Sequence, residues 1–384
     1  MLRKPGQLVP FVYRLPFLVF DEKVISLHKP FPMSQISKKP IIIAGPCSAE
    51  TEKQVMETAR QLSAHKAITA FRSGVWKPRS RPGNFEGAGD IALSWLQNVK
   101  AEFGFSTAVE VATPKHVEKA LQADVDYLWI GARTTANPFS VQELSKALSG
   151  LEVNIMVKNP VNPDLALWVG ALERVMQVTK GQVLAIHRGF YPYEQTPYRN
   201  IPKWEIPIEL KTLMPEIPII CDPSHISGDR SLVPEVSQYA LDLNFDGLMI
   251  ESHIDPDHAL SDANQQLKPQ DLTELLDNLQ FRVQNLNGNT HTALENFRNQ
   301  IDSIDSQILE LLAQRMRTTQ KIGEYKKTRN IAAFQLNRWK KIIRSRIETG
   351  DSLGLSKDFV KKMLQSVHKE SIRIQSEIMK QKKK

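Results

Sequence analysis

The chain has 384 residues, more than one typical domain, and 50 Lys and Arg residues against 42 Asp and Glu residues. Its two cysteines exclude a disulfide-framework protein and favour a reducing, cytoplasmic setting. The excess positive charge is local, because residues 291–384 hold 21 of the basic residues and only 10 of the acidic ones. These features predict a domain of roughly 250 residues followed by a smaller, basic one.

Residues 1–38 contain an apolar run at 8–20 that is interrupted by Pro10, Arg14 and Pro16. The run is shorter than the roughly 20 residues that a membrane span needs, and it lacks the unbroken core of a secretory signal. We therefore expect no membrane association, leave 1–38 unassigned as an N-terminal extension, and regard Met33 as an alternative start.

Eight short apolar runs follow, separated by stretches with helical periodicity such as 51–64 and 114–123. Continuous apolar character suits strands of a parallel sheet that is buried on both faces. Alternation of strand and helix predicts an α/β fold, a (β/α)8 TIM barrel over 39–283. The expected strands lie in the runs 41–48, 67–74, 105–112, 127–133, 154–160, 183–190, 217–225 and 247–253.

The expected strands close with polar or charged residues, and TIM-barrel active sites lie where the strands end. Cys47, His225, Glu251 and the nearby Asp262 combine a thiolate, an imidazole and two carboxylates. This mixed set suits a divalent transition metal ion such as Mn²⁺, Fe²⁺, Zn²⁺ or Co²⁺. His187 and His253 stand beside rim residues, and strand alternation predicts a packing role for each.

Six cations accompany this set at the same expected rim. Because they outnumber the acidic residues that would face them, they predict a small, multiply charged anionic substrate bound through guanidinium and ammonium groups. The six residues are Arg72, Lys77, Arg79, Arg133, Lys158 and Arg188.

Five motifs closely resemble those of 3-deoxy-D-arabino-heptulosonate 7-phosphate (DAHP) synthase: GPCSAE (45–50), KPRS (77–80), IGARTT (130–135), DPSH (222–225) and IESHIDPDHALSDANQQL (250–267). The resemblance covers roughly 38–283 and implies condensation of phosphoenolpyruvate with erythrose 4-phosphate. It also implies residue roles. The metal would be bound by Cys47, His225, Glu251 and Asp262, phosphoenolpyruvate by Arg72, Lys77, Arg133, Lys158 and Arg188, and the sugar phosphate by Arg79 and Ser80.

Two points stay open in the barrel. Glu110 is a candidate for positioning the water that adds to the substrate, and a structural role beside Lys158 or Arg133 is equally open. The sister family, 3-deoxy-D-manno-octulosonate 8-phosphate synthase, is the alternative. That family usually carries Asn after the lysine, so the KPRS motif favours erythrose 4-phosphate, and Cys47 favours metal dependence.

A linker is expected at 284–290, and beyond it the pattern becomes helical, which predicts an all-α domain over 291–384. Two heptad seams are expected. Arg315 interrupts the first, and because no acidic residue lies one turn away, a bound anion would be its partner. The seams comprise Leu294, Phe297, Ile301, Ile304, Ile308, Leu311, Arg315, Thr318, Ile322 and Tyr325, then Leu364, Val367, Ser371, Ile374 and Ile378.

The stretch 291–378 resembles the all-helical class of chorismate mutase, which needs no cofactor. By this resemblance Arg298 reaches the partner subunit's pocket in an intertwined homodimer, and Arg315 and Arg338 hold the carboxylates of chorismate. Lys326 and Gln375 would face the ether oxygen, supported by Ser371. Electrostatic stabilisation of that oxygen suffices for the rearrangement.

Two positions depart from this pattern: Trp339 stands where Glu usually contacts the substrate hydroxyl, and Gln335 where an acidic residue is common. The complete cationic set favours an active mutase, and a silent domain that senses chorismate or prephenate is the alternative. A further alternative is a helical bundle that only dimerises, with basic side chains that lie along its apolar surface and reach the solvent. Nucleic-acid binding by the basic tail is disfavoured because the cations of the seam face inward and aromatic residues are few.

Overall fold

The computed structural model describes residues 40–77, 83–193, 195–282 and 289–380. The described residues form two compact units, one within 40–282 and one within 289–380. None of the helices in these ranges is long and apolar enough to cross a membrane.

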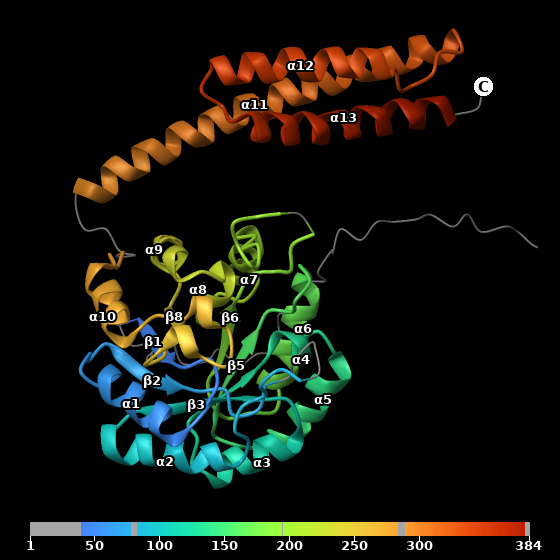
Figure 1. Cartoon of the computed structure of the whole chain (residues 1–384). Coiled ribbons are helices and arrows are strands. Elements are labelled where there is room, and N and C mark those ends of the chain that lie inside the picture. The colour runs from blue at the N-terminus through green and yellow to red at the C-terminus, as the bar shows by residue number, and fades with distance from the viewer. Residues whose placement is uncertain (1–39, 78–82, 194, 283–288, 381–384) are drawn as a thin grey trace, which may run out of the picture. The chain divides into compact units, whose positions relative to one another are not determined.

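Eight parallel strands of the first unit pair in chain order and close into a barrel surrounded by helices (Figure 1). The predicted (β/α)8 fold is confirmed. The strands are β1 (Ile41–Gly45), β2 (Ile68–Arg72), β3 (Ser106–Val111), β4 (Tyr127–Ile130), β5 (Asn154–Lys158), β6 (Val183–His187), β7 (Ile219–Cys221) and β8 (Gly247–Glu251).

Helices connect successive strands and cover the outside of the barrel. Several begin with a side-chain cap: Thr51 accepts from the Gln54 amide, and Thr113 accepts from the His116 amide. The long helices are α1 (Glu52–Leu62), α2 (Ile91–Phe103), α3 (Pro114–Gln122), α5 (Pro138–Ala147), α6 (Leu165–Met176), α7 (Glu205–Leu213), α9 (Val233–Asp242) and α10 (Pro269–Asn278). Shorter helices are α4 (Ala132–Thr135), α8 (Pro223–Ser227), η3 (Arg230–Leu232), η4 (Pro256–His258) and η5 (Ala263–Gln265).

The barrel interior is filled by a layer of nine buried side chains. Since strand residues alternate between the two faces, the residue two positions after each interior residue also points inward, one step nearer the carboxyl end. Six of these positions are charged. The interior layer contains Ala70, Ala108, Met156, Ile186, Ile220 and Met249, and the charged positions that follow are Arg72, Glu110, Lys158, Arg188, Asp222 and Glu251.

Four expected terminal residues lie beyond the observed strands. Strands β1 and β6 end at Gly45 and His187, before Cys47 and Arg188, while Arg133 lies in α4 and His225 in α8. The DPSH sequence starts a helix because Pro223 occupies its first turn and the Asp222 carboxylate accepts from the His225 amide. These residues still follow the carboxyl ends of their strands.

The second unit consists of α11 (Asn289–Thr328), α12 (Leu336–Ser352) and α13 (Lys357–Lys380). Small residues of α11 pack against α13: Thr319 is buried, and a side chain added at Gly323 would meet the Gln375 backbone and Ile378. The expected seam of α11 is not the face that α13 covers, since Ile322 and Tyr325 are exposed. Close approach of the backbones, which small residues allow, selects the Thr319 face instead.

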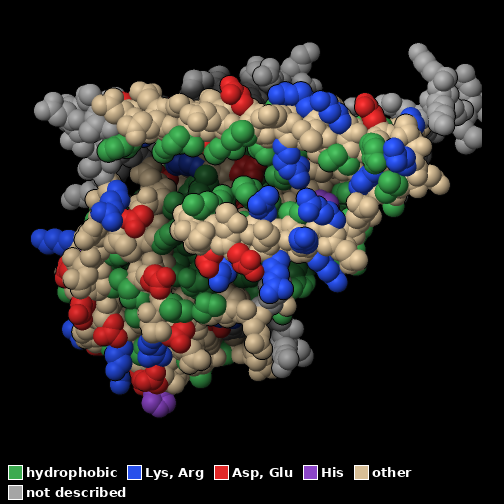
Figure 2. All heavy atoms as spheres, turned by 90° about the horizontal axis from the view of Figure 1, so that it is seen from above, with side chains coloured by type: hydrophobic (Ala, Val, Ile, Leu, Met, Phe, Trp, Pro, Cys, Tyr) green, Lys and Arg blue, Asp and Glu red, His purple; other side chains and the backbone are tan. Residues whose placement is uncertain are grey.

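The N-terminal half of α11 carries an uncovered apolar face within one chain. Its side chains are about half exposed or more, from 48% at Ile308 to 64% at Leu311. Hydrophobic side chains are visible at the surface between Lys and Arg side chains in Figure 2. We call this the α11 apolar face, and it consists of Phe297, Ile301, Ile304, Ile308 and Leu311.

Candidate functional site

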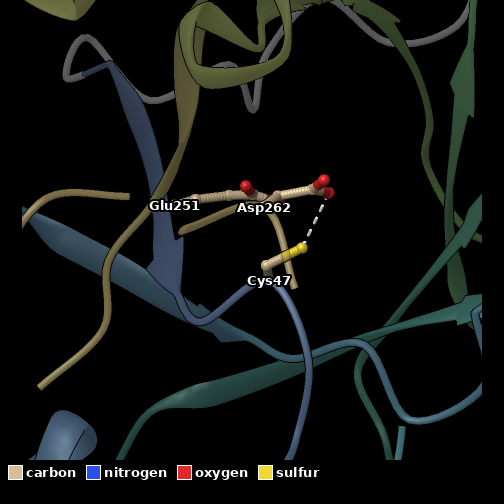
Figure 3. A group of neighbouring side chains, drawn as sticks. All are labelled: Cys47, Glu251 and Asp262. Carbon is tan, nitrogen blue, oxygen red and sulfur yellow. Dashed lines mark hydrogen bonds between the residues drawn. The ribbon is translucent and has the colours of Figure 1, made fainter. Parts of the chain in front are cut away.

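Cys47, Glu251 and Asp262 converge at the carboxyl end of the barrel (Figure 3). Their ligand atoms all lie within 4.8 Å of one another, and the Cys47 thiol donates to Asp262 Oδ2 at 3.1 Å. Gln265 Nε2 donates to Glu251 Oε2 at 2.6 Å, while Glu251 Oε1 is buried without a hydrogen-bond donor. Sequence positions more than 200 residues apart thus form one compact group of thiol and carboxylates.

His225 stands beside this group but is not part of it, because membership requires a ligand atom within 4.8 Å of all the others. Its Nδ1 lies 2.9 Å from Asp222 Oδ2 and 3.8 Å from Glu251 Oε1. Burial lowers the pKa of His225 against the opposing effect of Asp222, which favours a neutral imidazole. With Nδ1 facing Asp222, the ring presents Nε2 as its other possible ligand atom.

The electrostatics of Cys47, Glu251 and Asp262 favour a bound cation. Burial, together with Glu251 and Asp262, raises the pKa of the Cys47 thiol to about 12, although Lys77 acts in the opposite direction. Burial also acts to raise the pKa of Glu251, but His225, Arg72 and Lys77 outweigh it and hold the carboxylate ionised. A soft sulfur, an imidazole and two carboxylates fit a divalent transition ion, which would replace the thiol proton.

Arg72 is a buried cation with donors left over. Its Nη2 lies 3.1 Å from Glu251 Oε1, and its guanidinium carbon lies 4.8 Å above the Trp129 ring centroid. Arg72 Nε and Nη1 are buried without a hydrogen-bond partner. Unsatisfied donors are costly in a protein interior, so these two groups favour an anion in the barrel mouth.

Lys77 and Lys158 add two more buried cations, and Arg188 adds a partly buried one. Lys77 Nζ lies 2.5 Å from Cys47 Sγ, and Lys158 Nζ lies 2.8 Å from Asp222 Oδ2. Arg188 Nη1 donates to Asn200 Oδ1 at 2.6 Å, and burial lowers the pKa of Arg188 to about 10. These positive groups sit in a low-dielectric mouth where their field is weakly screened.

Arg133 and Glu110 complete the predicted mouth among the described residues. The charge of Arg133 acts on Arg188, so the two cations lie near each other. Glu110 acts electrostatically on both Arg72 and Lys158. A side chain at Gly131 would come within 2.1 Å of Glu110 Oε1, so the glycine makes room for this carboxylate. Arg79 and Ser80 lie outside the described residues.

Four polar residues at the mouth were not predicted as site residues from the sequence. Arg199 Nη1 lies 3.1 Å from Asp262 Oδ1, and Asp222 joins Lys158 to His225. Gln266 Oε1 accepts from the Cys47 amide at 2.9 Å, and Gln265 holds Glu251. Asp222, Gln265 and Gln266 lie in the motifs quoted above, so the resemblance could have identified them. No feature of the sequence marked Arg199 as a site residue.

His187 points away from the mouth, as expected from strand alternation. Its ring lies among aromatic rings, 5.2 Å from Trp204 and 5.8 Å from Phe190 between centroids. Burial lowers the pKa of His187 to about 3. His253 is buried with Nε2 at 3.5 Å from Glu50 Oε2. The predicted packing role of His187 is confirmed by this environment.

A second group of predicted residues meets in the helical unit. Arg315 Nη1 donates to Ser371 Oγ at 2.5 Å, and Lys326 Nζ donates to the Ala333 carbonyl at 2.7 Å. Burial lowers the pKa of Arg315 and of Lys326. Gln375 donates to the Ser371 carbonyl, and its Oε1 is buried without a partner. The Arg315 guanidinium and a free amide oxygen thus lie between α11 and α13, while Lys326 reaches the segment between α11 and α12.

One other predicted residue, Arg298, lies outside this group. Arg298 is 59% exposed and pairs with Glu295 at 2.5 Å. It lies 17 residues before Arg315 on the same helix, which is about 26 Å along the axis. Arg338 is exposed on α12. Trp339 of α12 stacks on His368 of α13, with ring centroids 3.9 Å apart and an interplanar angle of 13°.

Two family models match the chain. The DAHP synthetase I family model matches residues 35–285, and the model of chorismate mutase type II matches 297–376. A phospho-2-dehydro-3-deoxyheptonate aldolase of Thermotoga maritima is 30% identical over 226 residues, which are 59% of this chain and 64% of that protein. The alignment therefore spans less than two thirds of that relative.

A 2-dehydro-3-deoxyphosphooctonate aldolase of Helicobacter pylori is 25% identical over 272 residues, covering 65% of this chain and 96% of that protein. Among solved structures, DAHP synthase from Thermotoga maritima superposes with a TM-score of 0.55 at 30% identity, over 62% of this chain and 68% of that one. A truncated form of the Thermotoga maritima synthase gives a TM-score of 0.53 at 25% identity, over 62% and 84%.

Proposed function

Because the chain belongs to the DAHP synthetase I family and carries a type II chorismate mutase domain, we propose that it is a bifunctional enzyme. The barrel condenses phosphoenolpyruvate with erythrose 4-phosphate to give DAHP and phosphate. The helical domain rearranges chorismate to prephenate. The convergence of the Cys47, Glu251 and Asp262 side chains beneath a ring of cations is the observation that carries the first activity.

Phosphoenolpyruvate is the anion that suits the mouth. Arg72 and Lys158 supply buried positive charge for its phosphate and carboxylate, with Lys77, Arg133 and the partly buried Arg188 beside them. Arg72 contributes guanidinium donors that are otherwise unsatisfied. Clamping the substrate in this way orients its C3 carbon toward the aldehyde and lowers the entropic part of the barrier.

Cys47, His225, Glu251 and Asp262 would hold the divalent ion, and Mn²⁺, Fe²⁺, Zn²⁺ and Co²⁺ are the candidates. Such an ion, when bound, polarises the aldehyde oxygen of the sugar phosphate as a Lewis acid. Glu110, near Lys158 and Arg72, would orient the water that adds at C2 of phosphoenolpyruvate before phosphate leaves. Arg79 and Ser80 would bind the phosphate of erythrose 4-phosphate.

The test of the barrel activity is phosphate release by the full-length protein after treatment with a chelator and addition of each metal in turn. We expect release with phosphoenolpyruvate and erythrose 4-phosphate only when a metal is restored. A preference for arabinose 5-phosphate would identify the octulosonate synthase instead, the activity named for the Helicobacter pylori relative. Equal rates with and without metal would refute the proposed metal dependence.

The mutase proposal rests on two cations. Arg315 donates to Ser371, one turn from the buried amide of Gln375. The charge of Lys326 acts on His368, which lies on the same helix as Gln375. Ser371 fixes the Arg315 guanidinium, so the positive charge is positioned before the substrate arrives. Arg315 and Arg338 would bind the two carboxylates. Lys326, together with the second N–H of Gln375 Nε2, would stabilise the negative charge that develops on the ether oxygen. No nucleophile or cofactor is required.

Chorismate disappearance measures this activity. Lys326→Ala should abolish turnover, and Lys321→Ala on the exposed part of the same helix is the matched control that should retain it. If the wild-type protein binds chorismate but does not convert it, the domain is a sensor, and the synthase rate in the presence of chorismate or prephenate becomes the readout. Equal turnover by both lysine variants would contradict the proposed role of Lys326.

A homodimer would complete the mutase site. Arg298 lies about 26 Å along α11 from Arg315, too far to reach the same pocket, so it would act in the partner's site. The α11 apolar face is the surface that a second copy would cover. We also infer a cytoplasmic location, since both cysteines are free and buried and a reducing compartment preserves the Cys47 thiol.

A further inference from the structure

His368 and Trp339 form an aromatic pair beside the cations of the helical site. Trp339 belongs to α12 and His368 to α13, and their rings stack with centroids 3.9 Å apart. Phe334 packs against the same imidazole at 5.9 Å. Two aromatic contacts hold the imidazole plane, so His368 has little freedom to turn.

His368 lies on the same face of α13 as the residues already assigned to the site. Ser371 and Gln375 follow it by three and seven residues, which places all three side chains in one stripe. Arg315 and Lys326 act on His368 from α11, and with burial as the larger effect they lower its pKa. The lowered pKa favours a neutral imidazole, and the two cations lie close enough to act on it.

His368 Nε2 is buried and has no hydrogen-bond partner. A neutral imidazole carries a single ring proton, and with that proton on Nδ1 the buried Nε2 is a hydrogen-bond acceptor. Gln375 Oε1 is the second buried acceptor without a partner in the same stripe. Two unsatisfied acceptors beside two cations suit a ligand that is anionic and also carries a hydroxyl.

We propose that His368 Nε2 accepts the hydrogen bond of the chorismate ring hydroxyl, with Trp339 as the residue that positions the imidazole. The proposal rests on the mutase function proposed above. Position 339 usually carries the acidic acceptor for this hydroxyl in the all-helical mutases, and here an indole occupies it. The acceptor has thus moved from α12 to α13, and Trp339 contributes by stacking on the imidazole.

Substrate discrimination tests the proposal. The full-length protein and its His368→Leu variant are compared on chorismate and on the analogue that lacks the ring hydroxyl. The wild-type protein should prefer chorismate, and His368→Leu should reduce the ratio of the two kcat/KM values about tenfold, the usual effect of losing one buried hydrogen bond. Turnover of the analogue should stay near the wild-type value, because the analogue never made the bond.

His368→Gln restores an acceptor near the Nε2 position and should recover most of the preference for chorismate. Trp339→Leu should raise KM for chorismate more than for the analogue, because the imidazole loses the ring that holds it. Circular dichroism and the urea midpoint establish that each variant is folded. An equal fall on both substrates, or an unchanged ratio in His368→Leu, would overturn the proposal and make His368 a packing residue.

The outcome also separates this proposal from the mutase function. If the wild-type protein converts neither compound, calorimetric binding of chorismate and of the analogue replaces turnover, and the same tenfold change in relative affinity is expected. If chorismate does not bind, both proposals fail. If chorismate binds or reacts and Lys326→Ala abolishes turnover while His368→Leu keeps full discrimination, the mutase function stands and only the role of His368 fails.

Discussion

Asp222 is the residue whose replacement tests the barrel site most sharply. Its fully buried carboxylate lies 2.8 Å from Lys158 Nζ and 2.9 Å from His225 Nδ1. Burial acts to raise the pKa of Asp222, but His225, Lys158 and Arg72 outweigh it and hold the pKa well below its usual range. One buried carboxylate thus pairs with Lys158, which is proposed to bind the substrate, and with His225, which is proposed to bind the metal.

Asp222→Asn preserves the shape and removes this charge. Breaking a buried pair by neutralising one partner costs about 3–5 kcal/mol, because the other charge stays buried. With a urea dependence of roughly 3 kcal/mol per molar for a domain of this size, the midpoint should fall by about 1 M or more. Metal affinity should fall about 10- to 100-fold, because His225 loses the carboxylate that orients its ring.

The assays are urea unfolding of the full-length protein and titration with Mn²⁺ after chelation. Asp242→Asn is the matched control. Asp242 pairs with Arg282 at 2.7 Å and accepts from Gln238 at the surface, so its replacement should leave both values unchanged. If Asp222→Asn matches the control in urea midpoint and binds Mn²⁺ within twofold of wild type, the argument for a shared buried charge is refuted.

Three further predictions concern the thiol, the buried histidine and the α11 apolar face. Co²⁺ added to the protein should give thiolate-to-cobalt absorbance that Cys47→Ser abolishes and Cys221→Ala retains; absorbance that survives in Cys47→Ser would contradict thiolate ligation. Because the folded-state pKa of His187 is about 3 and the unfolded value is near 6.5, its contribution to stability is complete above pH 6.5 and is lost as pH falls toward 3. Between pH 7.5 and 5 the free energy of unfolding should fall by about 2 kcal/mol more in wild type than in His187→Phe, and parallel pH curves in urea unfolding would refute this. Ile304→Glu should shift the protein from dimer to monomer in sedimentation velocity, whereas Ser306→Glu on the opposite side of α11 should not; two dimeric variants would argue against this face as the interface.

The sequence alone determined the barrel and the identity of its charged residues. Alternating apolar runs and helical stretches required a parallel sheet covered on both faces, and period-two spacing carried Arg72, Lys158 and Glu251 to the mouth. These are local properties, because the direction of a strand side chain depends on its parity along the chain. The expectation for His187 succeeded for the same reason, since its parity is opposite to that of Arg188.

Only the tertiary structure decided which charged groups share a partner. Asp222 meets Lys158 from 64 residues away, and Arg199 meets Asp262 from 63 residues away. Contacts of this kind depend on barrel closure and loop paths, which have no short-range pattern. The DPSH segment likewise became a helix because a proline and a capping carboxylate outweighed the apolar run before it.

The helical unit divides in the same way. Sequence periodicity predicted the helices and placed Arg315 and Ser371 each on an expected seam, because a period near 3.6 specifies a helix face. It did not predict that Thr319 and Gly323 would form the contact with α13 and leave Ile304 and Leu311 exposed. Nor did it reveal that Trp339 would stack on His368 from another helix. Packing between helices selects a face by how closely the backbones can approach, and that choice depends on residues distant in the chain.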